Sequence, residues 1–229
     1  MLQMKRYSKV TPEGTKDLLF EECLIHRMVE EKLSRVFASR GFNEVVTPGM
    51  EFMDVFDPES SGIAPEIMYK MADRRGRLVV MRPDSTMPIA RLAATRLQNE
   101  EKPLRLYYTQ RIYRNNPNLT GRSDEVLQSG VELLGASGKR ADLEAIATAV
   151  EALSCCTPDF RLELGHAGFF RVIADQLPIS PEQREDIRST IEAKNYAALN
   201  TLLDGLEQTP SVAAMRRLPR LFGGEEVFA

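Results

Sequence analysis

The sequence predicts an α+β fold in which an antiparallel sheet is flanked by helices and followed by a small helical C-terminal extension. Three apolar segments have the length and the β-branched or aromatic content of strands, namely residues 78–81, 104–108 and 126–134. The segments 17–40 and 139–153 carry apolar side chains at the three- and four-residue spacing of a helix face. We therefore predict a core domain over residues 1–176, with six strands or fewer, and a helical extension over residues 177–229.

Both predicted helices of the core domain have an apolar face. In the first helix this face consists of Leu24, Ile25, Met28, Val29, Leu33, Val36 and Phe37. Gly41 ends that helix, because glycine adopts the left-handed conformation after a helix without a Cβ clash. The second helix presents Leu143, Ile146, Ala147, Val150 and Leu153. We expect both helices to pack on the sheet.

Side chains alternate between the two faces of the predicted strand 126–134. On one face lie Gln128, Gly130 and Glu132, and on the other lie Leu127, Val131 and Leu133. The second face is core, and the first is polar with a gap at the glycine. Glycine inside a strand packs nothing, so something approaches the sheet there. A small ligand, a β-bulge and a covering helix all fit this pattern.

A loop with two arginines precedes that strand. Arg114 lies on the same strand face as Ile112, and the residues after it, Asn115-Asn-Pro-Asn118, have the composition of a turn. Guanidinium groups bind carboxylate and phosphate in a bidentate fork, so Arg114 and Arg122 are candidate anion contacts. A solvated basic loop is the alternative, because charged loop residues are commonly exposed.

Asp84-Ser-Thr86 precedes a segment with helical periodicity. Pro88 would lie in the first helical turn, where its missing N–H costs least. Asp84 and Thr86 therefore fit a helix N-cap. The functional alternative aims the same oxygens at a ligand amine.

Composition excludes several classes of protein. A net charge of −3 gives little long-range attraction for a polyanion. The sequence has no apolar run long enough to span a bilayer and no signal peptide, so we expect a cytoplasmic protein. Cys23, Cys155 and Cys156 cannot form a disulfide framework, and with only two histidines we expect no metal site.

The second half of the chain carries structural patterns. Residues 160–164 alternate as a strand does. His166 follows them without a catalytic partner in any recognisable motif, so a structural role is favoured. Ser180-Pro-Glu-Gln183 is a capping box that begins a helix extending to about Lys194.

Several of these motifs together resemble histidyl-tRNA synthetase, a class II aminoacyl-tRNA synthetase. The residues that resemble its motif 2 region are Arg82-Pro-Asp-Ser-Thr86, Tyr113-Arg114, Gly121-Arg122, Gln128-Ser-Gly130 and Glu132-Leu-Leu-Gly135. Upstream, Gly41-Phe-Asn-Glu-Val-Val-Thr-Pro48 with Glu51 resembles the end of motif 1, and Thr11-Pro-Glu-Gly-Thr-Lys-Asp17 resembles the N-terminal segment. The resemblance implies a class II synthetase-like antiparallel sheet and a homodimer through residues 24–48.

The departures from that pattern concern the ATP site. Asn116 stands where the family has a glutamate, and Asp124 replaces a basic residue. Pro83-Asp84 replaces the usual Pro-Glu, and the sequence ends before the family's motif 3. With these changes the chain resembles the paralogues that serve as regulatory subunits of ATP phosphoribosyltransferase.

That resemblance implies a non-catalytic protein without cofactors and without tRNA charging. Its partner would be the short-form catalytic subunit, which it would activate and make sensitive to histidine in the first step of histidine biosynthesis. By the same resemblance, Asp84 and Thr86 bind the ammonium of histidine, Arg114 its carboxylate, and Gln128 and Glu132 the ammonium and imidazole side. Whether the effector binds there or at a subunit interface stays open.

Two other functions remain possible from the sequence. A histidyl-tRNA synthetase or a fragment of one would show histidine-dependent ATP–pyrophosphate exchange. A stand-alone amino-acid-binding module would bind histidine without exchange and without a partner.

Overall fold

The structure, a computed structural model, describes residues 9–115 and 123–224. It consists of two compact units, Met1–Arg161 and Leu162–Ala229. The boundary predicted after residue 176 falls inside the second unit, and the difference concerns α5 (Ala167–Ala174). Phe170, Ile173 and Ala174 of α5 pack in the hydrophobic core of the helical unit, so α5 belongs to that unit and not to the sheet.

The first unit is built on strands β5 (Leu104–Tyr113) and β6 (Glu125–Leu134). They pair antiparallel without a bulge from Leu104 opposite Leu134 to Tyr113 opposite Glu125. The short strand β1 (Asn43–Glu44) adds to β5 in parallel, which gives the order β1-β5-β6. The predicted antiparallel pair is therefore confirmed, and the sheet around it is mixed.

A second sheet is present beside the first, where the sequence predicted a single sheet. It has the order β2-β4-β3, with strands β2 (Met50–Phe52), β3 (Lys70–Ala72) and β4 (Leu78–Met81), all antiparallel. The short helices η1 (Met53–Phe56), α2 (Pro58–Ser61) and η2 (Pro65–Ile67) connect β2 to β3. Phe56, Met68 and Val80 form its core.

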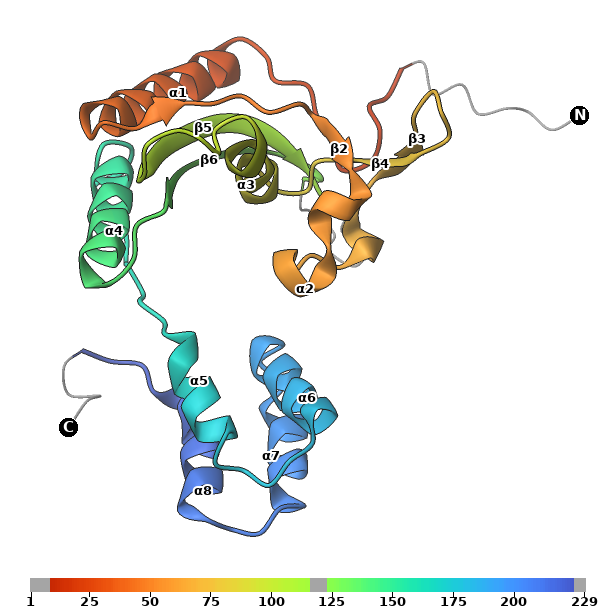
Figure 1. The fold of residues 1–229 in the computed structure, drawn as a ribbon, viewed down its shortest axis with the longest axis vertical. Coiled ribbons are helices and arrows are strands. Elements are labelled where there is room, and N and C mark those ends of the chain that lie inside the picture. The colour runs from red at the N-terminus through yellow and green to blue at the C-terminus, as the bar shows by residue number, and fades with distance from the viewer. Residues whose placement is uncertain (1–8, 116–122, 225–229) are drawn as a thin grey trace, which may run out of the picture. The chain divides into compact units, whose positions relative to one another are not determined.

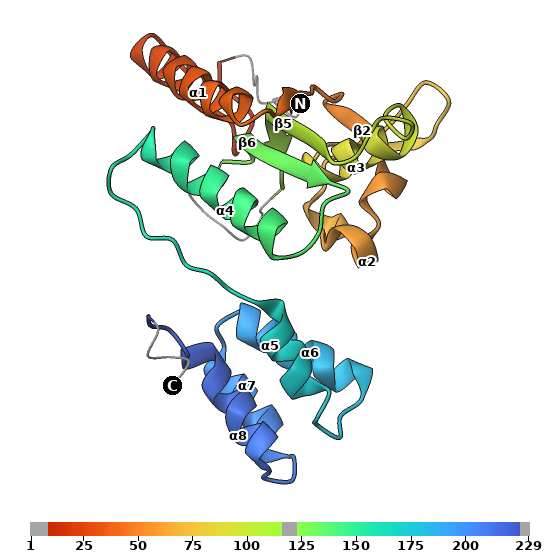
Figure 2. The ribbon, with the colours of Figure 1, turned by 60° about the vertical axis from the view of Figure 1, so that its left-hand side comes forward.

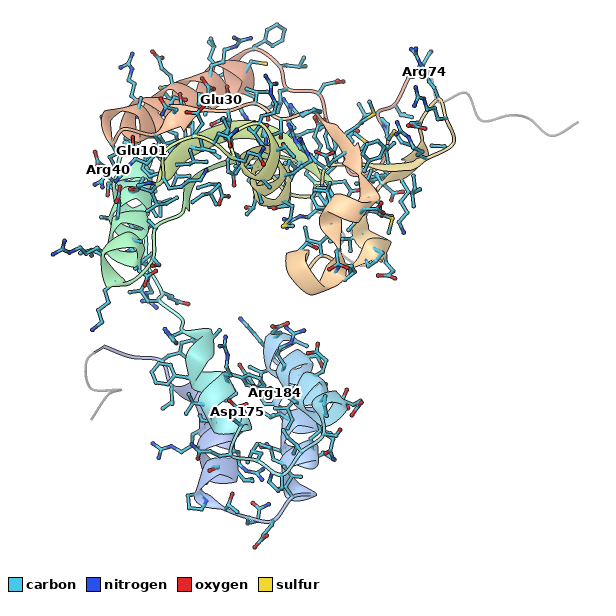
Figure 3. All side chains as sticks on the ribbon, in the orientation of Figure 1. Glu30, Arg40, Arg74, Glu101, Asp175 and Arg184 are labelled. Carbon is cyan, nitrogen blue, oxygen red and sulfur yellow. The ribbon has the colours of Figure 1, made fainter. Side chains whose placement is uncertain are left out.

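Three helices cover the two faces of the β5–β6 pair. Helices α1 (Glu21–Ser39) and α4 (Lys139–Ser154) pack on one face, where Phe37, Phe42, Tyr107 and Ala152 are buried together. Helix α3 (Thr86–Thr95) packs on the other face through Ile89, against Leu106 and Tyr108 (Figure 1). Helix α4 lies beside α1 (Figure 2). Arg40 follows α1 (Figure 3) and pairs with Glu151 of α4. The two faces of one strand pair therefore have different surroundings.

The predicted helix faces are only partly correct. In α1, Leu33, Val36 and Phe37 pack on the sheet, but Leu24, Ile25 and Met28 are exposed. In α4, Leu143 and Leu153 are exposed, while Thr148 and Ala152 are buried. Helix periodicity identifies which residues share a face, but the neighbouring elements decide how much of that face is covered.

A buried arginine links the two sheets. Arg82, at the end of β4, is only 6% exposed. Its guanidinium donates to the carbonyl oxygens of Arg111 at 2.6 Å, Thr47 at 2.6 Å and Pro48 at 3.2 Å, and to Gln110 Oε1 at 2.9 Å. Burial lowers the pKa of Arg82. This side chain fixes the position from which the chain continues into Pro83 and Asp84.

The second unit is a cluster of short helices. It contains α5, α6 (Pro181–Glu192), α7 (Tyr196–Asp204), α8 (Pro210–Arg217) and η3 (Leu218–Arg220). Its core consists of Ile187, Leu199, Leu203, Val212 and Met215, with Leu177 beside them. Both hydrogen bonds of the predicted capping box between Ser180 and Gln183 are present. An ion pair between Asp175 and Arg184 joins the end of α5 to α6 (Figure 3).

The strand predicted at residues 160–164 does not form. Residues 159–166 have no regular structure, and Phe160, Leu162 and Leu164 are 38%, 42% and 69% exposed. An alternating sequence needs a neighbouring strand to supply the ladder, and no described strand pairs with this segment. Across the described ranges, no helix combines the length and the apolar character that a membrane span requires.

Candidate functional site

Four of the predicted site residues gather where the start of α3 meets β6. The Thr86 hydroxyl donates to Glu132 Oε1 at 2.7 Å. Gln128 Nε2 donates to Asp84 Oδ1 at 3.3 Å, and Gln128 Oε1 accepts the Ser85 N–H at 3.2 Å. We call Asp84, Thr86, Gln128 and Glu132 the α3–β6 cluster. The alternation predicted for β6 is confirmed, because Gln128 and Glu132 lie on the face that α3 covers.

The N-cap that the sequence predicted at Asp84 and Thr86 is Ser85, whose side chain makes no capping hydrogen bond, and Asp84 acts from the preceding position. Asp84 Oδ2 accepts the backbone N–H of Thr86 at 2.8 Å, so the carboxylate stabilises the first turn of α3. The hydroxyl of Ser85, the N-cap residue, is buried and has no hydrogen-bond partner in the described structure. Asp84 therefore orders the helix start and still directs its other oxygen toward Gln128.

The α3–β6 cluster carries negative charge that no described basic side chain neutralises. Within the described residues, neither Asp84 nor Glu132 forms an ion pair. Burial raises the pKa of Glu132, and the nearby Asp84 raises it further, while the hydrogen bond from Thr86 lowers it. Two carboxylates in this situation attract a cationic group, because its charge would stabilise both.

Arg114 lies at the Asp84 end of this cluster. Its Nε donates to the carbonyl oxygen of Pro83 at 2.8 Å, and its backbone N–H donates to the carbonyl oxygen of Asp124 at 2.8 Å. The guanidinium is thus held next to the residue that precedes Asp84. Arg122 and Asn116 lie outside the described residues.

Tyr108 is the member of this site that sequence reasoning missed. It lies directly opposite Gly130 in the β5–β6 ladder and is 5% exposed. Burial, followed by the charges of Glu132 and Asp84, raises the pKa of Tyr108 to about 12. The alternation of residues 104–108 opposite residues 130–134 is the sequence feature that would have revealed it, once the register was known.

Tyr108 also explains the glycine in β6. A Cβ on Gly130 would lie 2.8 Å from the Tyr108 hydroxyl oxygen and 3.0 Å from the ring carbon that carries it. The β-bulge is excluded because the ladder continues through Gly130. The group that approaches the sheet at Gly130 is therefore the Tyr108 ring from the neighbouring strand.

Asp124 has a structural role. Its Oδ2 accepts the Tyr69 hydroxyl at 2.5 Å, and its backbone N–H donates to the Gly14 carbonyl oxygen at 2.7 Å. The hydrogen bond to Asp124 raises the pKa of Tyr69 to about 12. The aspartate that replaces a basic residue thus joins the N-terminal segment, the segment before β3 and the start of β6.

His166 has a structural role, as favoured by the sequence. Its Nδ1 accepts the Gly168 N–H at 3.0 Å, which caps the start of α5. The imidazole therefore acts as the N-cap of the first helix of the helical unit.

An uncovered surface lies on the N-terminal half of α1. Leu19, Phe20, Leu24, Ile25 and Met28 are exposed there, and we call them the α1 patch. A hollow beside it is lined by charged groups of both signs, including Lys16, Asp17, Arg27, Glu30 and Glu125. An apolar patch with a polar border is the composition of a protein–protein interface.

Comparisons with known proteins identify the family of this chain. The model of the family described as histidyl-tRNA synthetase matches residues 14–229. Proteins named ATP phosphoribosyltransferase regulatory subunit are 40% identical over 228 residues in Clostridium kluyveri and 41% identical over 226 residues in Clostridium novyi. These matches cover 98% and 96% of this chain but 58% and 53% of the relatives, so the chain spans little more than half of their length.

A solved structure has a similar fold. The crystal structure of an ATP phosphoribosyltransferase regulatory subunit/histidyl-tRNA synthetase from Bacillus halodurans is 28% identical and superposes with a TM-score of 0.88. That match covers 98% of this chain and 58% of the other. The family model and the superposition extend over nearly the whole chain. The chain therefore belongs to the histidyl-tRNA synthetase family and is similar within it to proteins named as regulatory subunits of ATP phosphoribosyltransferase.

Proposed function

We propose that this chain is the synthetase-like part of a non-catalytic regulatory subunit of ATP phosphoribosyltransferase. It acts in the cytoplasm, activates the short-form catalytic subunit and confers feedback by histidine on the first step of histidine biosynthesis. The observation that carries the proposal is the identity of 40% and 41%, over nearly the whole chain, to proteins named as such subunits. We expect no cofactor and no tRNA charging.

The effector histidine binds at the α3–β6 cluster in this proposal. Asp84 and Thr86 receive its ammonium, Gln128 and Glu132 its ammonium and imidazole side, and Arg114 its carboxylate. Asp84 and Glu132 carry negative charge without an ion-pair partner among the described residues, which supports binding of the positively charged part of histidine there. Arg114 is held at the Pro83 carbonyl, next to Asp84, and this position supports binding of the histidine carboxylate by its guanidinium. Arg122 remains a candidate second anion contact on the loop after Arg114.

The chain forms a homodimer through residues 24–48 in the same proposal. The α1 patch supports it, because Leu24, Ile25 and Met28 are apolar and exposed on one stretch of helix. Covering such side chains removes apolar surface from water at about 25 cal/mol per Å². A second copy of α1 presents a surface of the same composition, as a two-fold symmetric interface requires.

A histidyl-tRNA synthetase, or part of one, is the second candidate, because the family model that matches carries that description. The engagement of Asp124 by Tyr69 and Gly14 favours the regulatory function. A carboxylate fixed at this position repels the phosphates of ATP, whereas a basic residue would attract them.

The proposal is tested by adding the full-length protein to the short-form catalytic subunit and following phosphoribosyl-ATP formation while histidine is titrated. Stimulation that histidine reverses is expected. Absence of stimulation, together with histidine-dependent ATP–pyrophosphate exchange by the protein alone, would replace the proposal with the synthetase function.

A matched pair of variants tests the effector site. Glu132→Gln removes the charge that faces α3, and it should weaken histidine feedback about ten- to a hundredfold, as expected for a lost charge-assisted hydrogen bond. Glu125→Gln changes the same strand at a residue paired with Arg111 on the opposite face, and it should leave feedback unchanged. Unaltered feedback in Glu132→Gln would move the effector to a subunit interface.

A further inference from the structure

The backbone around Arg114 is hydrogen-bonded to three different parts of the first unit. Three consecutive N–H groups at the end of β5 each donate to a separate segment: Tyr113 to the Arg82 carbonyl at 3.0 Å, Arg114 to the Asp124 carbonyl at 2.8 Å, and Asn115 to the Ile67 carbonyl at 2.8 Å. The end of β4, the start of β6 and the segment before β3 therefore fix the point from which the Arg114 side chain extends.

Asp124, the backbone partner of Arg114, is itself held by two further segments. Its Oδ2 accepts the Tyr69 hydroxyl at 2.5 Å, and its N–H donates to the Gly14 carbonyl at 2.7 Å. Tyr69 is anchored in turn, because its carbonyl oxygen accepts the N–H of Met81 in β4 at 3.0 Å. The hydrogen bond to Asp124 raises the pKa of Tyr69 to about 12, so the phenol keeps its proton at physiological pH. A continuous series of hydrogen bonds thus runs from Tyr69 through Asp124 to Arg114.

Gly14 leaves the space that the Asp124 side chain occupies. A Cβ at position 14 would lie 2.4 Å from both Cγ and Oδ2 of Asp124, and Gly14 has a φ of +75°. Both the close approach and the left-handed backbone require glycine. The carboxylate is therefore enclosed between the Gly14 backbone and the Tyr69 hydroxyl, which restricts its movement.

We propose that Tyr69 is a positioning residue of the effector site: its hydroxyl holds Asp124, and Asp124 holds the backbone of Arg114 where the guanidinium receives the carboxylate of the ligand. This inference rests on the proposed function, because it takes Arg114 to bind the carboxylate of histidine. A guanidinium on a fixed backbone loses less freedom when a ligand binds, so its contact contributes more to affinity. The aspartate that departs from the synthetase pattern thus acquires a part in amino-acid recognition.

The test compares two ligands by calorimetry on the full-length protein. Histidine is compared with histamine, which has the ammonium and imidazole groups but lacks the carboxylate. Tyr69→Phe should weaken histidine binding about five- to tenfold and leave histamine binding unchanged, because only the carboxylate meets Arg114. Gly14→Ala displaces the Asp124 side chain and should give the same pattern. A merely structural defect would weaken the binding of both ligands alike.

Double variants test the route from Tyr69 to the ligand with histidine alone. Tyr69→Phe should add little to the loss caused by Asp124→Ala or by Arg114→Gln, because the tyrosine acts through both residues. Tyr113→Phe is the matched control. Its hydroxyl also donates to a carboxylate of the β5–β6 pair, Glu125 Oε1 at 3.5 Å, and its removal should leave histidine binding unchanged.

The outcomes distinguish this inference from the proposed function. Additive losses in the double variants, equal weakening of histidine and histamine binding, or an equal loss in Tyr113→Phe would overturn the positioning role and leave the regulatory function in place. Histidine binding that does not depend on Arg114, in a protein that stimulates the catalytic subunit, would also overturn it. Wild-type protein that binds histidine with the expected variant pattern, yet fails to stimulate the catalytic subunit, would uphold the inference and remove the proposed partner.

Discussion

Replacing Arg82 by methionine tests whether the two sheets depend on one buried cation. The substitution keeps an unbranched apolar side chain, which is shorter because the guanidinium is missing, and removes all of its donors. It leaves acceptors on Thr47, Pro48, Gln110 and Arg111, three of which are within 2.9 Å of the guanidinium. Because these groups are buried, water replaces the lost donors poorly.

The expected loss follows from the number and kind of bonds. A hydrogen bond to a charged group contributes about 1.5–3 kcal/mol, and neighbouring bonds from one side chain do not add fully. Arg82→Met removes several such bonds at once and leaves their buried acceptors unpaired, so we expect a loss of about 3–5 kcal/mol. Domains of this size have a free energy of unfolding of about 5–15 kcal/mol. The variant should therefore lose a large part of the stability of the first unit, which contains both sheets.

The assay is hydrogen exchange at increasing urea concentration, read separately for peptides of β4 and β5 and for peptides of α6 to α8. Protection should fall in β4 and β5 and stay unchanged in the helical unit. Arg77→Met is the control, because Arg77 is 54% exposed and pairs with Asp73 at the surface, where such pairs contribute about 0–1 kcal/mol. A loss below about 1 kcal/mol in Arg82→Met, or an equal loss in both variants, would refute the reasoning.

Three further predictions concern stability. Phe37→Ala should cost about 3–5 kcal/mol in urea unfolding, because Phe37 is 4% exposed between α1 and the sheet; a loss of less than 1 kcal/mol would contradict the packing described. Ser180→Ala removes one half of a capping box and should cost about 1 kcal/mol in thermal unfolding of the helical unit, so an unchanged Tm would argue against that cap. The third concerns Glu132, whose pKa is higher in the folded protein than in the unfolded chain. The stability that its protonated form contributes is present below the pKa of the unfolded chain and is lost as the pH rises through the pKa of the folded protein. Ligand-free Glu132→Gln should thus be more stable than wild type at pH 7.5, with the advantage disappearing below about pH 4; lower stability at pH 7.5 would show that the carboxylate has a cationic partner.

Local sequence features predicted local structure well. Gly41 adopts a φ of +79° after α1, as its place after an apolar helix face indicated. The alternation of β6 placed Gln128 and Glu132 on one face, and Ser180 begins its helix. Each of these features depends on residues a few positions apart, whose physical preferences act within one element.

Features that depend on partners distant in the sequence were not predictable. Tyr108 joined the site only because the register of β5 against β6 places it opposite Gly130. Arg82 was identified as part of a motif, but its burial depends on acceptors from β5 and from the segment after β1. The segment 160–164 has the composition of a strand and lacks the neighbour that would make it one.

Tyr107 and Tyr108 are adjacent in β5 and lie on opposite faces of it. Tyr107 packs against Phe37 of α1, the helix that carries the exposed patch, and Tyr108 packs over the cluster that holds Glu132. A single peptide unit therefore separates the side chain that packs on α1 from the side chain that packs on the α3–β6 cluster. A rotation of β5 about its own axis would move both tyrosines at once and in opposite directions, so the packing of α1 and the packing of α3 on this strand are mechanically coupled.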